Sequence, residues 1–146
     1  MHSITLRFLA PHNTPHAGAR VSGGTVLGWV DEAGFACASA WAHGDCVTAF
    51  LGNAHFLRPV RAGDLVEVRA HLAFTGETSM SLAIEVHTGA LASSELHMVL
   101  HCAAVYVALD ATSAPREVNN FSPETPGDMA LAQQVQAQIT AAQAVQ

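Results

Sequence analysis

The twenty residues at 23–42 (GGTVLGWVDEAGFACASAWA) are apolar on nearly every side when placed on a helix. A helix that is hydrophobic all round is typical of the buried centre of a domain, and this segment is too long for one strand. Ser22 stands where an N-cap is expected, and Gly44 follows the end of the segment. Two adjacent charges in the middle, Asp31 and Glu32, argue against a membrane span. The sequence therefore predicts one long buried helix around which the rest of the chain must fold.

The hydrophobic pattern changes its period outside this helix. Short segments of apolar or alternating residues are separated by Gly, Pro and Asp, which predicts strands with short connections. The predicted strands cover residues 3–10, 47–57, 65–75, 79–88 and 97–109. Short connections between the last four predict an antiparallel meander, and the whole predicts an α+β domain with one long helix packed on a curved sheet. A single sheet covers one face of such a helix, so we expect a homodimer.

The C-terminal part of the sequence differs in composition from the rest. Residues 112–128 are polar and contain three prolines, which predicts a linker. Residues 129–145 are rich in Ala and Gln and nearly uncharged, so we expect a terminal helix or a frayed tail. We therefore divide the chain into a domain at 1–111 and a linker with a C-terminal helix or tail at 112–146.

Charge and cysteine content argue against several classes of protein. The formal net charge is −6, every basic residue is arginine and no basic stripe is present, so we expect no nucleic-acid partner. The three cysteines form no pair typical of a zinc site or a disulfide framework, which fits a reducing, cytoplasmic compartment. The N-terminus lacks the apolar region of a signal peptide, and we find no motif for phosphate binding, dinucleotide binding or serine hydrolysis. We expect no membrane association, no metal and no cofactor.

Asp31 is a candidate functional residue because of its surroundings. An ionised carboxylate inside a core costs several kcal/mol unless it is paired or hydrogen-bonded, and no Lys or Arg lies within one helical turn of it. Either a site uses this carboxylate, or this face of the helix opens to solvent or to a dimer interface.

Gly23 and Gly24 at the helix start have unpaired backbone N–H groups that could hold a developing oxyanion. Because Asp31 lies ~10 Å further along the axis, we expect Asp31 of one chain to meet the glycines of another.

Four groups of residues occur in a characteristic order and spacing. They are Gly23-Gly24 before the helix, Asp31 within it, FLRPV with Gly63-Asp64 at 56–64, and Thr78-Ser79-Met80 at a strand start. Together they resemble the hotdog-fold acyl-CoA thioesterases of bacteria and mitochondria (the acyl-CoA hydrolase family), over roughly residues 3–111. The resemblance implies a hotdog fold, in which a sheet wraps around one long helix. It also implies a homodimer with a continuous sheet, and a hexamer built as a trimer of dimers.

The resemblance further implies a reaction and its catalytic residues. The substrate would be an acyl-CoA thioester, hydrolysed to free fatty acid and CoA at a subunit interface. Asp31 matches the family's catalytic aspartate, which activates water as a general base or attacks the thioester carbonyl as a nucleophile. Gly24 matches the turn whose amide polarises that carbonyl.

Four further residues are candidates for binding the CoA part of the substrate. Thr78 and Ser79 match family positions that line the pantetheine channel. Arg58 and Arg61 are candidates for contacts with the CoA phosphates, on charge and position alone.

One residue departs from the family pattern. The family usually has Asn seven residues before the first helix glycine, whereas this chain has His16 there, with Asn13 nearby. His16 could replace the Asn, act as an acid or base near neutral pH, or be an exposed loop residue. A loop His with a helix carboxylate also resembles the hotdog dehydratases and hydratases of 3-hydroxyacyl and enoyl thioesters, although their HFP signature is missing. A non-catalytic acyl-CoA-binding subunit is the other alternative.

Overall fold

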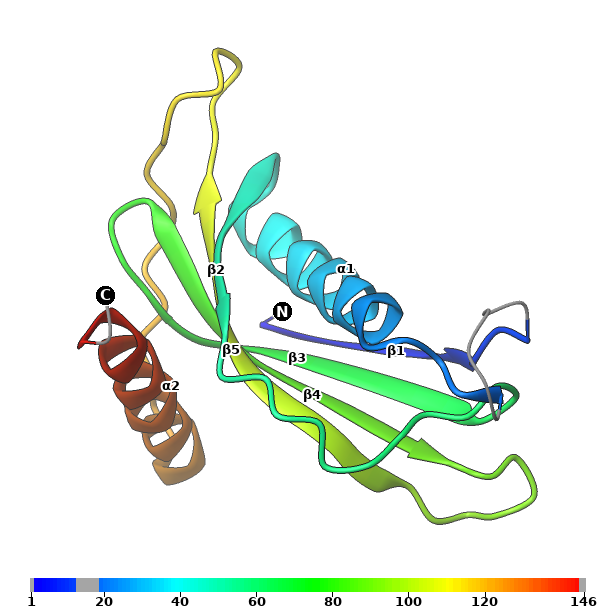
Figure 1. Ribbon diagram of the computed structural model, residues 1–146. Coiled ribbons are helices and arrows are strands. Elements are labelled where there is room, and N and C mark those ends of the chain that lie inside the picture. The colour runs from blue at the N-terminus through cyan, green and yellow to red at the C-terminus, as the bar shows by residue number, and fades with distance from the viewer. Residues whose placement is uncertain (1, 13–18, 145–146) are drawn as a thin grey trace.

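The computed structural model describes residues 2–12 and 19–144, and these form a five-stranded antiparallel sheet and two helices (Figure 1). The sheet curves around α1, whereas α2 lies on its other side. In chain order the elements are β1 (Ser3–Leu9), α1 (Gly23–Ala42), β2 (Cys46–Gly52), β3 (Leu65–Thr75), β4 (Ser79–Gly89), β5 (His97–Ala108) and α2 (Pro126–Ala144). The predicted α+β class, with one long helix packed on a curved antiparallel sheet, is confirmed.

The order of the strands differs from the predicted four-stranded meander. It is β1-β3-β4-β5-β2, so β3, β4 and β5 form the meander and β2 lies at the far edge beside β5. The reason is a longer connection than the sequence pattern suggested. β2 ends at Gly52, where Asn53 takes a left-handed conformation (φ 62°), and residues 53–64 then carry the chain across to β3. β2 is therefore an edge strand with one unpaired side in the single chain.

One side of α1 is buried against the sheet and the other side is open, so the prediction of a helix buried all round is wrong for the single chain. The buried side consists of Val26, Val30, Ala33, Gly34, Cys37, Ala38 and Ala42. These residues pack on the inner face of the sheet, where side chains such as Val68 and Ile84 are fully buried. The open side carries Gly24, Gly28 and Phe35, and Phe35 is 43% exposed.

Specific hydrogen bonds cap both ends of α1. The Ser22 hydroxyl accepts a hydrogen bond from the backbone N–H three residues later (3.1 Å), which confirms the predicted N-cap. At the other end His43 (φ 54°) takes the left-handed conformation, and Gly44 follows it. The Arg116 guanidinium donates to the carbonyl of Ala42 at 2.6 Å. Both ends of the helix are thereby fixed, and with them the position of the residues at its centre.

The C-terminal segment returns over the outer face of the sheet. α2 buries Val135 against Ala73 and Ala103, so the Ala- and Gln-rich residues form a packed helix through residue 144. The helix begins at Pro126, within the segment predicted as a linker. The domain boundary at residue 111 stays a prediction. Within the described ranges, neither helix is long and apolar enough to cross a membrane.

Candidate active site

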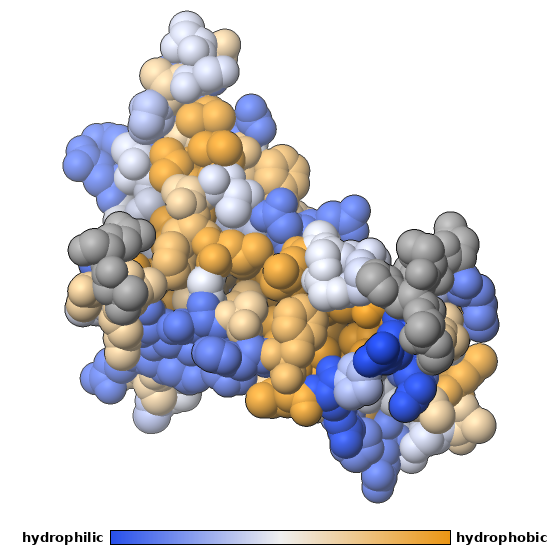
Figure 2. Space-filling view, viewed as in Figure 1, coloured by the Kyte–Doolittle hydropathy of each residue, from blue (hydrophilic) through white to orange (hydrophobic). Residues whose placement is uncertain are grey.

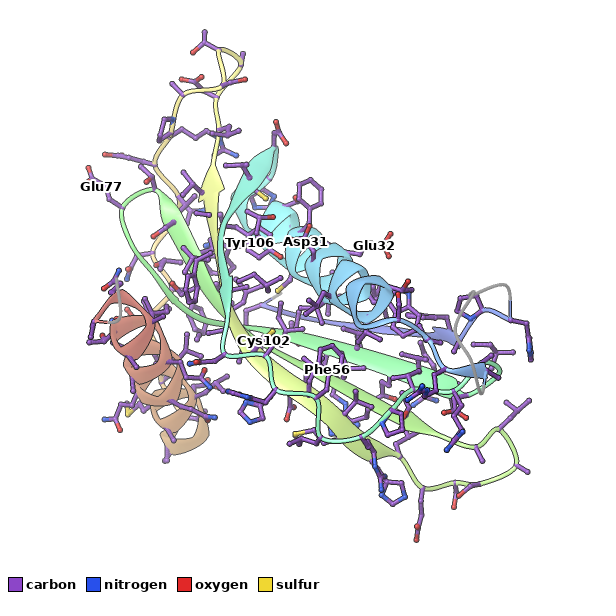
Figure 3. All side chains as sticks on the ribbon, viewed as in Figure 1. Asp31, Glu32, Phe56, Glu77, Cys102 and Tyr106 are labelled. Atoms are coloured by element: carbon purple, nitrogen blue, oxygen red, sulfur yellow. The ribbon has the colours of Figure 1, made fainter. Side chains whose placement is uncertain are left out.

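The carboxylate of Asp31 is held by two hydroxyl groups. Thr48 of β2 donates to its Oδ1 at 2.8 Å, and the Tyr106 phenol of β5 lies 3.0 Å from the same oxygen. In the part of the chain that the structure describes, Oδ2 accepts no hydrogen bond. Figure 3 shows Asp31 and Tyr106 next to each other where α1 crosses the sheet, with Glu32 pointing away. One carboxylate oxygen is thus anchored, and the other is left for a ligand or water.

Tyr106 reaches Asp31 because α1 has a glycine at the point of contact. The Tyr106 side chain is fully buried on the inner face of the sheet, and a Cβ at Gly34 would lie 2.2 Å from its hydroxyl oxygen. Neither Thr48 nor Tyr106 is among the residues that the sequence analysis predicts. Tyr106 offered a signal, because it is the only tyrosine and lies in an apolar strand where its O–H needs a partner.

Tyr106 acts here as a neutral donor. Burial, followed by the hydrogen bond to Asp31, raises the pKa of Tyr106 well above its usual range, so the phenol keeps its proton. Asp31 forms no ion pair with any described residue. Two hydroxyl donors, rather than a cation, therefore offset the cost of placing this half-buried charge between α1 and the sheet.

The open side of α1 is apolar around the carboxylate. Figure 2 shows apolar side chains gathered in the centre of this face, over α1 and its neighbours, with hydrophilic residues around them. Phe35, one turn after Asp31, and Val47 of the edge strand are both more than two-fifths exposed. A face of this kind is typical of a surface that another protein chain covers.

The N-terminus of α1 borders an open pocket of about 410 Å³. Phe56 and Leu57, from the connection before β3, form one wall of this pocket, and Gly23 forms part of the other. The Phe56 ring lies close to Gly23, where a Cβ would be 3.4 Å from the ring. Gly24 is exposed, and nothing lies within 4 Å of its Cβ position among the described residues. A ligand oxygen can therefore reach the backbone N–H groups at this helix end.

Arg58 and Arg61 lie together at an adjoining pocket of about 290 Å³, which His97 and Asp64 also line. Both arginine side chains are exposed, and the Asp64 carboxylate accepts a hydrogen bond from the backbone N–H of Arg61 (3.1 Å). The structure thus brings together the two arginines that the sequence analysis singles out. Their guanidinium groups offer donors that suit a phosphate.

Thr78 and Ser79 lie at the other end of the sheet. β4 starts at Ser79 and reaches the arginine pocket at Thr88 and Gly89, a span of roughly 30 Å. In Figure 3, Glu77, which precedes Thr78, lies at the left edge of the fold, whereas Phe56 lies near its centre. Within one chain, a single ligand pocket therefore does not contain both pairs of predicted CoA-binding residues.

Two further places do not add residues to this site. His16 lies outside the described residues, so its position relative to Asp31 stays untested.

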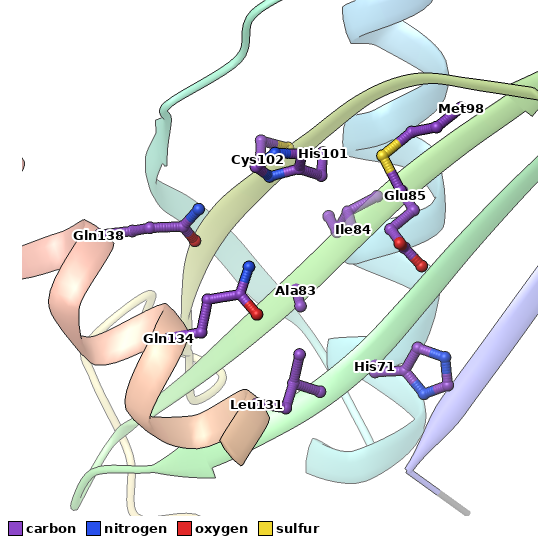
Figure 4. Close-up of a pocket in the computed structure, with 10 residues that line it drawn as sticks. All are labelled: His71, Ala83, Ile84, Glu85, Met98, His101, Cys102, Leu131, Gln134 and Gln138. Carbon is purple, nitrogen blue, oxygen red and sulfur yellow. The ribbon is translucent and has the colours of Figure 1, made fainter. Parts of the chain in front are cut away.

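A pocket of about 150 Å³ between α2 and the outer face of the sheet (Figure 4) contains His71, His101 and Glu85. The described residues include no group of three His, Cys, Asp or Glu side chains that could hold a metal ion. Cys102 also lines this pocket, but it belongs to the core on the inner face of the sheet. Burial raises its pKa to about 12, so its thiol is not an activated nucleophile.

Comparison with known proteins identifies the family. The family model of the thioesterase superfamily matches residues 18–93. The chain belongs to the thioesterase superfamily. It is 34% identical over 116 residues to the acyl-CoA thioester hydrolase YciA of Salmonella typhimurium, which covers 77% of this chain and 87% of the relative. It is 32% identical over 120 residues to an uncharacterised acyl-CoA thioester hydrolase of Buchnera aphidicola, which covers 80% and 88%. The family that the sequence motifs predict is confirmed.

Solved structures of thioesterases share the fold. An acyl-CoA hydrolase of Staphylococcus aureus in complex with coenzyme A superposes with a TM-score of 0.88 at 20% identity, covering 97% of this chain and 85% of that one. A hexameric thioesterase of Yersinia pestis has a TM-score of 0.73 at 31% identity, covering 78% and 93%. The fold of this thioesterase-superfamily chain is therefore the predicted hotdog fold.

Proposed function

We propose that this protein hydrolyses acyl-CoA thioesters to free fatty acid and CoA, with Asp31 as the catalytic carboxylate. The observation that carries the proposal is that the two oxygens of the Asp31 carboxylate differ in their contacts. Its Oδ1 is held by Thr48 and Tyr106, whereas its Oδ2 accepts no hydrogen bond from the described residues. The YciA relatives of Salmonella typhimurium and Escherichia coli, both 34% identical to this chain, are acyl-CoA thioester hydrolases.

Two routes through Asp31 lead to the same products. As a general base, Oδ2 takes a proton from water while the water oxygen bonds to the thioester carbonyl carbon. As a nucleophile, Oδ2 bonds to that carbon itself and forms an acyl anhydride, which water then opens. In both routes the C–S bond breaks, the acyl group ends as a carboxylate, and the CoA sulfur leaves as a thiolate that takes up a proton.

The carbonyl oxygen needs a donor that the same subunit does not place near Asp31. Gly24 begins the helix, and it lies ~10 Å along the axis from Asp31. The active site therefore combines Asp31 of one subunit with the N–H of Gly24 from a second subunit. The unpaired edge of β2 and the open side of α1 support this pairing, because both are exposed in the single chain and lie beside Asp31.

The homodimer follows from that interface, and a trimer of dimers is the assembly we propose. Structurally similar thioesterases from Yersinia pestis and another source are hexameric. In such an assembly one CoA molecule contacts Arg58 and Arg61 of one subunit through its phosphates. Thr78 and Ser79 line its pantetheine arm from another subunit, because the two pairs lie at opposite ends of the sheet.

Three positions replaced in a structurally similar enzyme agree with this assignment. Variants of the Staphylococcus aureus acyl-CoA hydrolase have an asparagine, an aspartate or a threonine changed to alanine. The aspartate and the threonine are seventeen positions apart in that chain, as Asp31 and Thr48 are here. The asparagine precedes the aspartate by fifteen positions, the separation of His16 from Asp31. This supports Asp31 and Thr48 as members of one site and His16 as the counterpart of an amide.

Release of free CoA, followed with a thiol reagent over saturated acyl-CoAs of increasing chain length, tests the proposal. We expect wild-type protein to release CoA and Asp31→Asn to lose at least a thousandfold in kcat, because the variant keeps the shape of the side chain but neither takes a proton nor attacks. Circular dichroism and sedimentation verify that the variant keeps its fold and assembly. Equal rates for both proteins would overturn the role of Asp31.

Absence of CoA release from every acyl-CoA would overturn the proposed reaction. Hydration of an enoyl-CoA would then point to a hotdog hydratase that uses His16 with Asp31. Binding of acyl-CoA without any conversion would point to a binding subunit.

A further inference from the structure

Tyr106 is a buried polar group that the proposed reaction does not yet use. Its hydroxyl oxygen lies 3.0 Å from Oδ1 of Asp31 and 3.2 Å from the backbone carbonyl oxygen of the same residue. No other described residue bonds to this hydroxyl, and the side chain is fully buried. A buried tyrosine hydroxyl needs a hydrogen-bond partner. The contact with Asp31 therefore either meets that need alone or also orients the carboxylate.

We propose that Tyr106 is a positioning residue for the reaction: its hydroxyl, together with that of Thr48, locks the Asp31 carboxylate so that Oδ2 faces the substrate. This inference rests on the proposed function, because Tyr106 positions Asp31 for the reaction that the proposed function assigns to it. Tyr106 itself contacts no reacting atom in this arrangement.

The two hydroxyls reach Oδ1 from different strands. Thr48 belongs to the edge strand β2, whereas Tyr106 belongs to β5, which is paired on both sides, with β4 and β2. A carboxylate with one donor can rotate about its terminal torsion, whereas two donors from separate strands fix the plane of the group. The geometry therefore leaves Oδ2, and not Oδ1, as the oxygen that can approach a water or a thioester.

The packing around the phenol places the end of its ring directly against α1. Gly34 leaves room for the phenol oxygen, since a Cβ there would lie 2.2 Å from it and 2.7 Å from the adjacent ring carbon. A second ring carbon lies 2.8 Å from that position, so the glycine makes room for the end of the ring as well as for the hydroxyl. The close approach of α1 brings the hydroxyl within hydrogen-bonding distance of Asp31.

The charge state of Tyr106 supports the same assignment. Burial and the neighbouring Asp31 carboxylate both raise the pKa of Tyr106, so it remains a donor and does not shuttle protons. Tyr106 therefore orients Asp31 as a neutral donor.

The kinetic test is Tyr106→Phe, which keeps the ring and removes only the hydroxyl. We expect kcat to fall by about tenfold and KM to change by less than about twofold. Cys102→Ala is the matched control, because it truncates a buried residue on the same face of β5 without contacting Asp31. It should lower the melting temperature and leave kcat and KM unchanged. A Tyr106→Phe enzyme with wild-type kcat would overturn the positioning role.

A second measurement does not depend on turnover. Because Tyr106 is the only tyrosine, the tyrosine ring doublet in the Raman spectrum reports its hydrogen bond alone. We expect the doublet to differ between the wild-type protein and Asp31→Ala, which removes the acceptor carboxylate. If this difference is found but wild-type protein hydrolyses no acyl-CoA, the proposed function fails and the contact stands. If wild-type protein hydrolyses acyl-CoA and the doublet is the same in Asp31→Ala, the function stands and the contact fails.

Discussion

The hydroxyl of Tyr106 lies where the side chain of any residue but glycine at position 34 would be: the Gly34 Cβ position is 2.2 Å from the phenol oxygen. Gly34 is the residue three positions after Asp31 on α1, and the same hydroxyl bonds to the Asp31 carboxylate. Helix α1, strand β5 and the carboxylate therefore meet at one contact. A change at Gly34 acts on the core and on the site together.

Gly34→Ala is expected to destabilise the protein by ~1–3 kcal/mol, because the methyl group overlaps the phenol and the ring is enclosed by the core. The gain in helix propensity of about 1 kcal/mol offsets only part of this cost. Denaturant unfolding measures the free energy, and Ala40→Gly, on the exposed side of α1, measures the propensity effect alone. We also expect kcat to fall, since the displaced phenol leaves Oδ1 of Asp31. A variant more stable than wild type would contradict this contact.

Thr48 offers a test of the second donor. Thr48→Val keeps the shape of the side chain and removes the hydroxyl that bonds to Oδ1 at 2.8 Å, so we expect kcat to fall about tenfold or more. Thr48→Ser keeps the hydroxyl and should stay within a few-fold of wild type. Steady-state kinetics with a preferred acyl-CoA separates the two. A loss in Thr48→Ser together with a wild-type rate in Thr48→Val would mean that the methyl group of Thr48, and not its hydroxyl, matters.

Local patterns predicted much of this fold because they depend on neighbours in the chain. The bounds of α1 follow from its apolar run with Ser22 at its start, and β3 follows from its alternation at 65–75. The position of β2 in the sheet could not be predicted from these patterns, because a strand pattern does not show which edge of a sheet the strand joins. The actual β2 ends at Gly52, five residues before the predicted end, and this lengthens the connection enough to cross the sheet.

Part of the site that we propose could be singled out from the sequence for the same physical reason. Asp31 stands out because a charge in an apolar helix is costly, and Gly24 and the two arginines stand out by type and spacing. Tyr106 lies 75 positions from Asp31 in the chain, so their contact depends on the register of β5 against α1, which the sequence pattern does not specify. Thr48 lies on β2, whose place in the sheet was not predicted either.

Arg58→Ala and Arg61→Ala are expected to raise KM for acyl-CoA several-fold each with kcat nearly unchanged, because the phosphates are bound equally in the ground and transition states. The double variant should show a weaker dependence of KM on salt. An acyl-pantetheine substrate without the nucleotide should erase the difference from wild type. Arg69→Ala removes an arginine that pairs with Glu67 instead and serves as the control. If the arginine variants still had a higher KM than wild type with acyl-pantetheine, phosphate binding by these arginines would be contradicted.

His16 is tested by His16→Asn, which restores the residue usual in the family. We expect activity to be kept or raised if the imidazole only stands in for an amide that holds water or the carbonyl. A bell-shaped pH profile that loses one limb in the variant, together with a collapse of kcat, would instead assign His16 an acid–base role. The comparison of pH–rate profiles decides between the two, with Asn13→Ala reporting whether the neighbouring amide contributes.

Phe35→Glu is expected to weaken the dimer, because Phe35 lies on the open side of α1 one turn from Asp31 and is 43% exposed in the single chain. A charge buried in an apolar interface costs several kcal/mol, so sedimentation velocity should show subunits dissociating at micromolar concentration. Activity should fall as the protein is diluted, because in the site we propose Asp31 and Gly24 come from different subunits. Met129→Glu is the matched control, since Met129 is similarly exposed (49%) but lies at the start of α2 on the outer side of the sheet. Full activity from a monomeric Phe35→Glu protein would show that one subunit holds a complete site.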